Sequence, residues 1–128
     1  MHTTARNGKD SSASEVDAGT SADAPIASIL LIAYNQQATI VEAIAGALAQ
    51  TYSPLEIVVS DDASSDDTWA HMQHAVAGYA GPHRVVLNRN EHNLGIGAHL
   101  SRVVELSRGV LLFVAAGVYA AKVLIFSK

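Results

Sequence analysis

Two adjacent carboxylates, Asp61 and Asp62, stand where an apolar run ends and a polar turn begins. The run, residues 55–60, has the length and composition of a buried strand, and a helical pattern follows the turn. Because the carboxyl ends of parallel strands form the ligand crevice of an open α/β sheet, the pair lies where a bound nucleotide would be recognised. The alternative is structural: both carboxylates would then belong to a turn that caps the helix.

Histidine is the other residue type that suggests chemistry, with six copies in the chain and no cysteine. His71 and His74 have helical spacing, but they fall on the side of their helix opposite Trp69, and no third metal ligand is evident. His92 and His99 lie near a glycine-containing loop, and nothing in their spacing indicates a role. We therefore predict surface positions for His71 and His74 and no metal site.

Apolar runs and helical patterns alternate from residue 26 onward. Strands are predicted at residues 26–33, 55–60, 84–88 and 110–114. Helices are predicted at residues 37–50, from 64 or 65 to about 77, and through 100–106. This βαβαβαβ order, with short connections, predicts an α/β fold: a Rossmann-like parallel sheet with helices on both faces.

Three signals mark the predicted ends of the helices. Ser64 to Asp67 fits a capping box, which would start the second helix at Ser64 or Ser65. Gly78 is expected to end that helix. Gly109 is expected to end the third helix, in the position where a left-handed residue is usual.

The composition limits the classes of protein that the chain can represent. Its 128 residues and 49% hydrophobic content support one domain with a real core. A net charge of −4 argues against a nucleic-acid partner, because such domains usually carry a basic face. No secretory signal precedes Pro25, and residues 110–126 fall short of a full membrane span. We expect a cytoplasmic protein, with peripheral membrane association left open.

The two ends of the chain differ from its middle. Residues 1–25 are rich in Ser, Thr, Ala, Asp and Gly and are predicted to be a disordered tail, because they cannot bury enough apolar surface to offset the entropy of ordering. Residues 118–128 form a divergent apolar C-terminal end. We predict a stray, exposed segment there, which would favour association.

Four stretches, in this order, resemble family 2 glycosyltransferases, enzymes of the GT-A fold. They are residues 29–35 (ILLIAYN), 47–52 (ALAQTY), 57–66 (IVVSDDASSD) and 88–95 (NRNEHNLG). The resemblance covers about residues 26–117 and matches the nucleotide-sugar-binding half of such a domain. It implies transfer of a sugar from a nucleotide-sugar donor, UDP- or dTDP-linked, to an unknown acceptor, in cell-wall or polysaccharide biosynthesis.

The resemblance also implies roles for particular residues. Ala33, Tyr34 and Asn35, at the end of the first strand, would line the pocket of the base. Asp61 or Asp62 would accept hydrogen bonds from the base and the ribose, since an ionised acceptor makes the stronger class of hydrogen bond. For Tyr34 a plain packing role is the alternative.

Two further positions are expected near the sugar diphosphate. Gly95 and Gly97 lie between a strand and a helix, where missing side chains would let a diphosphate approach the backbone amides. Arg102, on the helix that follows, would face the diphosphate or solvent. Gly95 could instead simply supply a turn.

The chain departs from the family pattern after its fourth strand. The family places an acidic metal motif there, typically Asp-x-Asp, so that a divalent cation, Mn²⁺ or Mg²⁺, neutralises the leaving diphosphate. This chain has Val118 and Tyr119 instead, and no Asp or Glu follows Glu105. The metal ligands and the catalytic base are therefore missing, and no catalytic residue is assigned. We hypothesise a truncated or frame-disrupted glycosyltransferase, diverging near Gly117 and inactive by itself.

Two other classes remain as alternatives. One is a non-catalytic nucleotide-binding or interaction module that has lost its metal site. The other is a dinucleotide-dependent oxidoreductase, since Asp62 follows the second strand as an acidic residue does in ribose-binding Rossmann domains. Residues 33–38 lack the glycine fingerprint that such an enzyme needs after its first strand, which argues against it.

Overall fold

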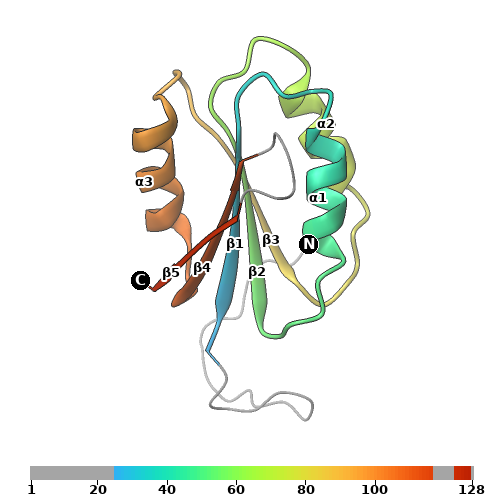
Figure 1. Cartoon of the computed structure of the whole chain (residues 1–128). Helices are drawn as coiled ribbons and strands as arrows, with labels where there is room; N and C mark the ends of the chain where they lie inside the picture. Colours follow the sequence, from blue (N-terminus) through green and yellow to red (C-terminus); the bar gives the residue numbers. More distant parts are fainter. Residues whose placement is uncertain (1–24, 117–122, 128) are drawn as a thin grey trace.

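The computed structural model describes residues 25–116 and 123–127, which form an α/β domain (Figure 1). In chain order the elements are β1 (Ala27–Ala33), α1 (Ile40–Leu48), β2 (Leu55–Asp61), α2 (Thr68–Val76), β3 (Arg84–Arg89), α3 (Ile96–Leu106), β4 (Leu111–Ala116) and β5 (Val123–Ser127). The predicted strands and helices therefore exist, with ends that differ from the predicted ones by a few residues. The predicted tail, apart from Pro25, lies outside the described residues.

The strands make one sheet in the order β3-β2-β1-β4-β5. β1 pairs in parallel with β2 on one side and with β4 on the other, and β2 pairs in parallel with β3. Helices α1 and α2 cover one face, and α3 covers the other (Figure 1). The predicted fold class, a Rossmann-like sheet with helices on both faces, is confirmed. Because the strand order turns back at β1, the ligand crevice is expected at the carboxyl ends of the central strands.

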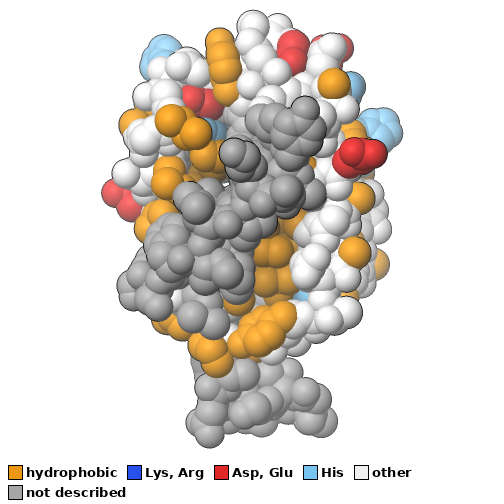
Figure 2. Space-filling view, in the orientation of Figure 1, with side chains coloured by type: hydrophobic (Ala, Val, Ile, Leu, Met, Phe, Trp, Pro, Cys, Tyr) orange, Lys and Arg blue, Asp and Glu red, His pale blue; other side chains and the backbone are white. Residues whose placement is uncertain are grey.

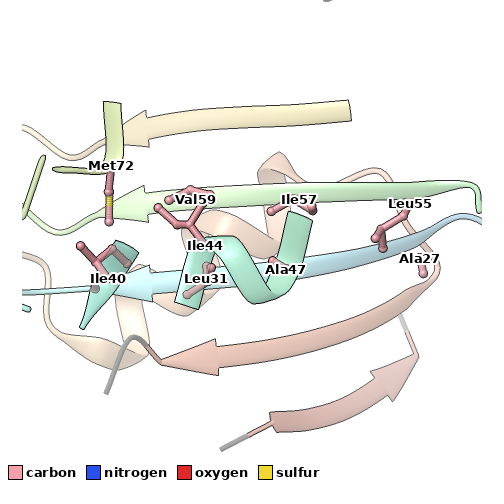
Figure 3. Packing of buried hydrophobic residues seen from close by; sticks show 10 residues of the cluster. Ala27, Leu31, Ile40, Ile44, Ala47, Leu55, Ile57, Val59 and Met72 are labelled. Carbon is pink, nitrogen blue, oxygen red and sulfur yellow. The ribbon is translucent and has the colours of Figure 1, made fainter. Parts of the chain in front are cut away.

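Alternation along the central strands divides the core between the two faces. On one face, Leu31 and Val59 pack against α1, whose Ile40 and Ile44 point toward the sheet (Figure 3). On the other face, a second cluster joins β1 and β2 to α3 and contains Leu30, Ile32, Val58 and Val103. Strands that are apolar on both faces are typical of parallel sheets, and they fix both helical layers against the sheet.

The end of the chain corrects one prediction. Val123–Ser127 is not a stray segment: it forms β5, which pairs antiparallel with β4. The physical reason is that β4 would otherwise present an unpaired edge, and the short connection between Ala116 and Val123 permits only an antiparallel return. Residues 117–122 and 128, where the predicted divergence begins, lie outside the described residues. Among the described helices, none combines the length and apolarity needed to cross a membrane.

The start of α2 corrects a second prediction. The helix begins at Thr68 rather than at Ser64 or Ser65, and Asp67 occupies the N-cap position without a side-chain hydrogen bond to the helix. The capping box does not form because both serines bind elsewhere: Ser64 is hydrogen-bonded to Asp61, and Ser65 donates to Asn35. The polar turn thus serves the strand ends and not the helix.

Gly109 corrects a third prediction. The last turn of α3 ends at Ser107 in extended conformation, with φ −83° and ψ 152°, and Gly109 has no left-handed φ. A Cβ on Gly109 would instead lie 2.4 Å from Ser28 Oγ and 2.7 Å from Ser28 N. The glycine is needed for close approach to β1. Gly78, which was predicted to end α2, lies just beyond the helix and has φ 79°, a left-handed conformation.

Candidate functional site

Asp62 lies at the carboxyl end of β2, where its side chain binds the loop between β3 and α3. Its Oδ1 accepts hydrogen bonds from Asn90 Nδ2 and from the backbone N–H of Leu94, each at 2.8 Å. Its Oδ2 accepts from the backbone N–H of Gly95 at 3.0 Å and from Asn93 Nδ2 at 3.1 Å. Only 2% of Asp62 is exposed. Four donors occupy the acceptor positions of a carboxylate, so Asp62 fastens this loop to the sheet.

The environment of Asp62 favours its ionised form. Burial by itself would raise the pKa of the carboxyl group, but hydrogen bonds from the backbone of Leu94, the side chain of Asn90 and the backbone of Gly95 outweigh it. With the added charge interaction of His99, the pKa of Asp62 lies below its ordinary value of 3.8. The residue is therefore a carboxylate at neutral pH.

Asp61 is fully buried and holds the turn that follows β2. Its Oδ2 accepts from the backbone N–H of Ser64 at 3.1 Å and pairs with Arg89 Nε at 3.2 Å, and its Oδ1 accepts a short hydrogen bond from Ser64 Oγ. The guanidinium of Arg89 also lies 5.7 Å from the ring centroid of Trp69. Asp61 is thus paired with a cation that joins the ends of β2 and β3.

Asn35 connects the end of β1 to the same turn. Its backbone N–H donates to Ser64 Oγ at 2.8 Å. Its side-chain Oδ1 accepts from the backbone N–H groups of Ser65 at 2.9 Å and Asp66 at 3.3 Å. Asn35 has φ 52°, a left-handed conformation that asparagine tolerates better than most residues. The Tyr34-Asn35 segment and the acidic turn are therefore held side by side.

The structure thus brings most of the predicted site residues together at the carboxyl ends of the strands. Figure 2 shows acidic and histidine side chains around the upper end of the molecule, where these strands end. The methyl group of Ala33 is buried in the core, and its carbonyl accepts from Asp62 N at 2.9 Å. Tyr34 is 47% exposed. Gly95, at φ 86°, gives its amide to Asp62. Arg102 is exposed on α3, and no hydrogen bond or ion pair of its side chain falls within the described residues.

The sequence placed His99 near the glycine-containing loop but indicated no role for it; in the structure it belongs to α3 and lies within the site. The side chain is 2% exposed, and its Nε2 lies 2.7 Å from Ser60 Oγ, which also accepts from Asn88 Nδ2 at 2.9 Å. Burial lowers the pKa of His99 from its ordinary value of 6.5, and the charges of Asp62 and Asp61 oppose that shift. A signal was present, because His99 precedes the buried Val103 by four residues and so shares its helix face.

The donors Asn90, Asn93 and Arg89 were also missed. Each follows the apolar part of β3, so their polar types were visible, but their acceptors, Asp61 and Asp62, lie 28 to 31 residues earlier in the chain. Only the pairing of β2 with β3, which places Asp61 opposite Arg89, shows that these residues meet.

The described side chains around the site do not converge on a position for a divalent cation. Within residues 25–116 and 123–127, no three His, Asp or Glu side chains converge in a way that could hold a metal ion. The carboxylates of Asp61 and Asp62 are engaged by protein donors. Of the two helical histidines, His74 is exposed, and His71 Nδ1 lies 3.1 Å from the carbonyl oxygen of Gln37. The described residues do not fit a metal site.

A doubly wound sheet with a polar site at the carboxyl ends of its central strands defines a class of ligand-binding α/β domains. Residues 28–115 match the model of glycosyl transferase family 2, and the chain belongs to this family. The resemblance stated from the four sequence stretches is thereby confirmed.

Two relatives of this chain are much longer than the part that it matches. It is 35% identical over 95 residues to the chondroitin synthase of Escherichia coli, a match that covers 74% of this chain and 13% of that protein. It is 48% identical over 44 residues to the UDP-Glc:alpha-D-GlcNAc-diphosphoundecaprenol beta-1,3-glucosyltransferase WfaP of Escherichia coli, covering 34% of this chain and 18% of that protein. The matched part is thus less than a fifth of either relative.

Solved structures support the same fold. The mannosyltransferase PcManGT of Pyrobaculum calidifontis, in complex with GDP-Man and Mn²⁺, superposes with a TM-score of 0.67 at 21% identity, covering 73% of this chain and 27% of that one. The glucosyl-3-phosphoglycerate synthase of Mycobacterium tuberculosis, in complex with Mn²⁺, UDP and phosphoglyceric acid, gives a TM-score of 0.56 at 26% identity, covering 73% and 33%. The first likeness shows the fold alone.

Proposed function

We propose that this chain is the donor-binding half of a family 2 glycosyltransferase and that it binds a UDP- or dTDP-linked sugar at the carboxyl ends of β1 and β2. One observation carries the proposal. Tyr34 and Asn35, the turn 61–66 and the loop 90–95, which are distant in sequence, are tied together at that edge by hydrogen bonds. The UDP complex of the 26% identical glucosyl-3-phosphoglycerate synthase supports the same assignment.

Each proposed contact has a different chemical basis. The exposed ring of Tyr34 offers a face for a base. The side-chain hydrogen bonds of Asn35 within the described residues use its Oδ1, so its Nδ2 can donate to a polar group of the nucleotide. Asp61 Oδ1 accepts one hydrogen bond within the described residues, from Ser64, so it can accept a second, but Asp61 is fully buried and a donor from the base or ribose would reach it only if the turn 61–66 moves. Asp62 would have to exchange one of its four partners to do the same.

The diphosphate is proposed to lie near the start of α3. Gly95 leaves the approach open, because a Cβ there would meet nothing within 4 Å, and the positive end of the helix favours an anion. Arg102 lies further along α3 and is the cation that we propose to face the diphosphate. Since the amide of Gly95 is already bound to Asp62, the diphosphate would use the amides that follow it.

Transfer is not proposed for this chain alone. No Asp or Glu follows Glu105, so a general base to take the proton of an acceptor hydroxyl and carboxylates to hold Mn²⁺ would have to come from outside this chain. We propose that the chain binds the donor without turning it over.

The test is calorimetric titration of the whole chain with UDP, with and without Mn²⁺. We expect binding that Mn²⁺ does not strengthen and that Asp62→Ala removes. Asp67→Ala is the matched control, because Asp67 is an exposed carboxylate of the same turn whose side chain does not cap α2. Circular dichroism of each variant verifies that it is folded. Absence of UDP and dTDP binding by the folded wild-type chain would overturn the proposal.

The competing function is an interaction module that does not bind nucleotides. The buried polar contacts of Asp61 and Asp62 favour it, since both carboxylates already serve the fold. The UDP titration separates this module from a donor-binding chain, and UDP release from UDP-glucose in the presence of Mn²⁺ tests the proposed absence of turnover. Release by the chain alone would contradict the absence of turnover, and binding without release would agree with the proposal.

A further inference from the structure

A continuous series of side-chain hydrogen bonds joins His99 to Asp62. His99 Nε2 lies 2.7 Å from Ser60 Oγ, and Asn88 Nδ2 donates to the same oxygen at 2.9 Å. Asn88 Nδ2 also donates to Asn90 Oδ1 at 3.1 Å, and Asn90 Nδ2 donates to Asp62 Oδ1 at 2.8 Å. We call these five residues the polar chain. It links α3, β2 and the end of β3.

The backbone closes the polar chain into a ring. The N–H of His99 donates to the carbonyl oxygen of Gly95 at 2.9 Å, and the N–H of Gly95 donates to Asp62 Oδ2 at 3.0 Å. Asp62 is therefore reached from His99 by two routes, one through side chains and one through the first turn of α3. A closed ring of this kind restricts its members, because moving one of them strains hydrogen bonds on both sides.

We infer that His99 is a positioning residue of the donor site: its imidazole orients Ser60 and, through Asn88 and Asn90, fixes the carboxylate of Asp62 and the loop 90–95. This inference rests on the proposed function, since the site that it positions is the one proposed to bind the nucleotide. His99 itself is buried, so its effect is transmitted through the polar chain.

The charges around His99 come mainly from one side. Asp62 and Asp61, at the end of β2, act on the imidazole, and Asp61 is already paired with Arg89 of β3. The other carboxylate of β2, Glu56, is near the start of that strand. It accepts a hydrogen bond from the backbone of Arg108, which follows the C-terminal end of α3, whereas His99 is near the N-terminal end of α3.

The other elements around His99 add little charge. The sequences of β1 and β4 contain no titratable residue. The charged residues of α3 itself, Arg102 and Glu105, are exposed. Asp62 and Asp61 are thus the carboxylates that stabilise a protonated His99, and burial opposes that protonation.

Protonation of His99 would change the polar chain. Where neutral His99 accepts at Nε2 from the Ser60 hydroxyl, protonation reverses this hydrogen bond, because a protonated imidazole is a donor at both nitrogens and Ser60 Oγ could only accept from it, as it already does from Asn88. The hydroxyl hydrogen of Ser60 would then need another acceptor. We therefore expect donor binding to weaken in mild acid, as His99 takes up a proton.

The experiment compares His99→Gln, which cannot titrate, and Ser60→Ala, which breaks the polar chain but keeps the histidine. His74→Gln is the matched control, because His74 is an exposed histidine on α2. The first measurement is amide hydrogen exchange at Leu94 and Gly95 by NMR in the chain without nucleotide. Ser60→Ala is expected to speed exchange at both amides about tenfold, and the control is expected to leave it unchanged.

The second measurement is the affinity for UDP-glucose between about pH 8 and about pH 5.5. UDP-glucose is the probe because, unlike UDP, it has no terminal phosphate that titrates near pH 6. We expect binding by the wild-type chain and by His74→Gln to weaken toward acid, and binding by His99→Gln to be independent of pH. Ser60→Ala is expected to bind about tenfold more weakly at neutral pH.

The two proposals fail in different ways. If the wild-type chain binds no UDP-glucose, the proposed function fails, and exchange at Leu94 and Gly95 alone decides whether the polar chain positions the loop. If Ser60→Ala exchanges these amides as slowly as the wild-type chain, the positioning role of His99 is overturned. A wild-type pH profile that persists in His99→Gln also overturns it.

Discussion

The carboxylate of Asp62 accepts hydrogen bonds from four donors of a single loop. The effect of a substitution at Asp62 on stability follows from the loss of these four bonds. Two of the donors are backbone N–H groups, of Leu94 and Gly95, that no rotamer change can redirect. Removal of a buried acceptor costs more than the net value of its hydrogen bonds, because each donor must then be left unpaired or rehydrated. Asp62 therefore contributes to folding whether or not it also contacts a nucleotide.

Asp62→Ala is expected to lower the free energy of unfolding by about 2–4 kcal/mol, since buried donors lose a charged acceptor. Urea denaturation followed by circular dichroism measures the change. Asp67→Ala, at the exposed N-cap position, should shift the free energy of unfolding by less than about 1 kcal/mol. Equal effects of the two substitutions would show that Asp62 is not the anchor of the loop.

Stability is expected to decrease as the pH falls below the ordinary pKa of histidine. The pKa of His99 is lowered in the folded chain, chiefly by burial. Between that lowered pKa and about pH 6.5 the unfolded chain binds a proton that the folded chain does not, so the free energy of unfolding falls with falling pH. The lowered pKa of Asp62 acts in the same direction further into acid, below about pH 4.

Urea denaturation at about pH 7.5 and about pH 5.5 tests this expectation. The wild-type chain should lose stability at the lower pH, and His99→Gln should lose less. A wild-type chain that is equally stable at both pH values would contradict the burial of a neutral His99.

Among the elements, α1 is held against the sheet by its buried side chains, Ile40, Ile44 and Ala47. Ile44 is 1% exposed and points into the cluster beside Leu31 and Val59 (Figure 3), whereas Val41 on the same helix is 48% exposed. The buried residues are spaced three or four apart, as on one face of a helix, so burial and not helix propensity fixes the orientation of α1.

Ile44→Ala is expected to lower the free energy of unfolding by about 2–5 kcal/mol, because the substitution leaves a cavity between helix and sheet. Val41→Ala, which also shortens a β-branched side chain in α1, should change it by less than about 1 kcal/mol. Thermal and urea unfolding of both variants provide the comparison. A larger loss in Val41→Ala would place the buried face of α1 elsewhere.

The elements also show which parts of the structure could be predicted from the sequence. Apolar runs located β1 to β4 because strands buried on both faces leave a plain pattern. The start of α2 and the role of Gly109 could not be predicted, since each depends on a partner distant in the chain, Asn35 for Ser65 in one case and Ser28 for Gly109 in the other. β5 escaped prediction because pairing with β4, and not local pattern, defines it.

The candidate site, too, could be predicted from the sequence only in part. Asn35, Asp61, Asp62 and Gly95 could be grouped from the sequence, because residues at the carboxyl ends of parallel strands must meet. Their hydrogen-bond partners could not be assigned, since each pairing depends on side-chain directions across two strands. For that reason the sequence pointed to Asp62 and not to His99.

For the molecule as a whole, β5 covers an edge of the sheet that would otherwise be open. It pairs with β4 from Leu111↔Ser127 to Ala115↔Val123. An unpaired strand edge is a template for pairing with another chain. β3 forms the opposite edge of the sheet.

Deletion of residues 123–128 is therefore expected to increase self-association, because β4 becomes an edge strand. Size-exclusion chromatography with light scattering measures the fraction of dimers and larger species. Deletion of residues 2–20, which removes no described element, is the control. A chain without residues 123–128 that is as monodisperse as the control would show that β5 does not protect this edge.

The place of β1 at the centre of the sheet has a consequence for synthesis. Ala27 pairs with Leu55 on one side and with Leu111 on the other. On a ribosome that adds about 5–20 residues per second, the second partner is made about 4–16 s after β1 itself. β1, β2 and β3 can assemble during that interval, while the edge of β1 that later pairs with β4 is still unpaired. The nascent chain is then most open to misassembly or to a chaperone, and slower translation between residues 90 and 110 would lengthen the delay.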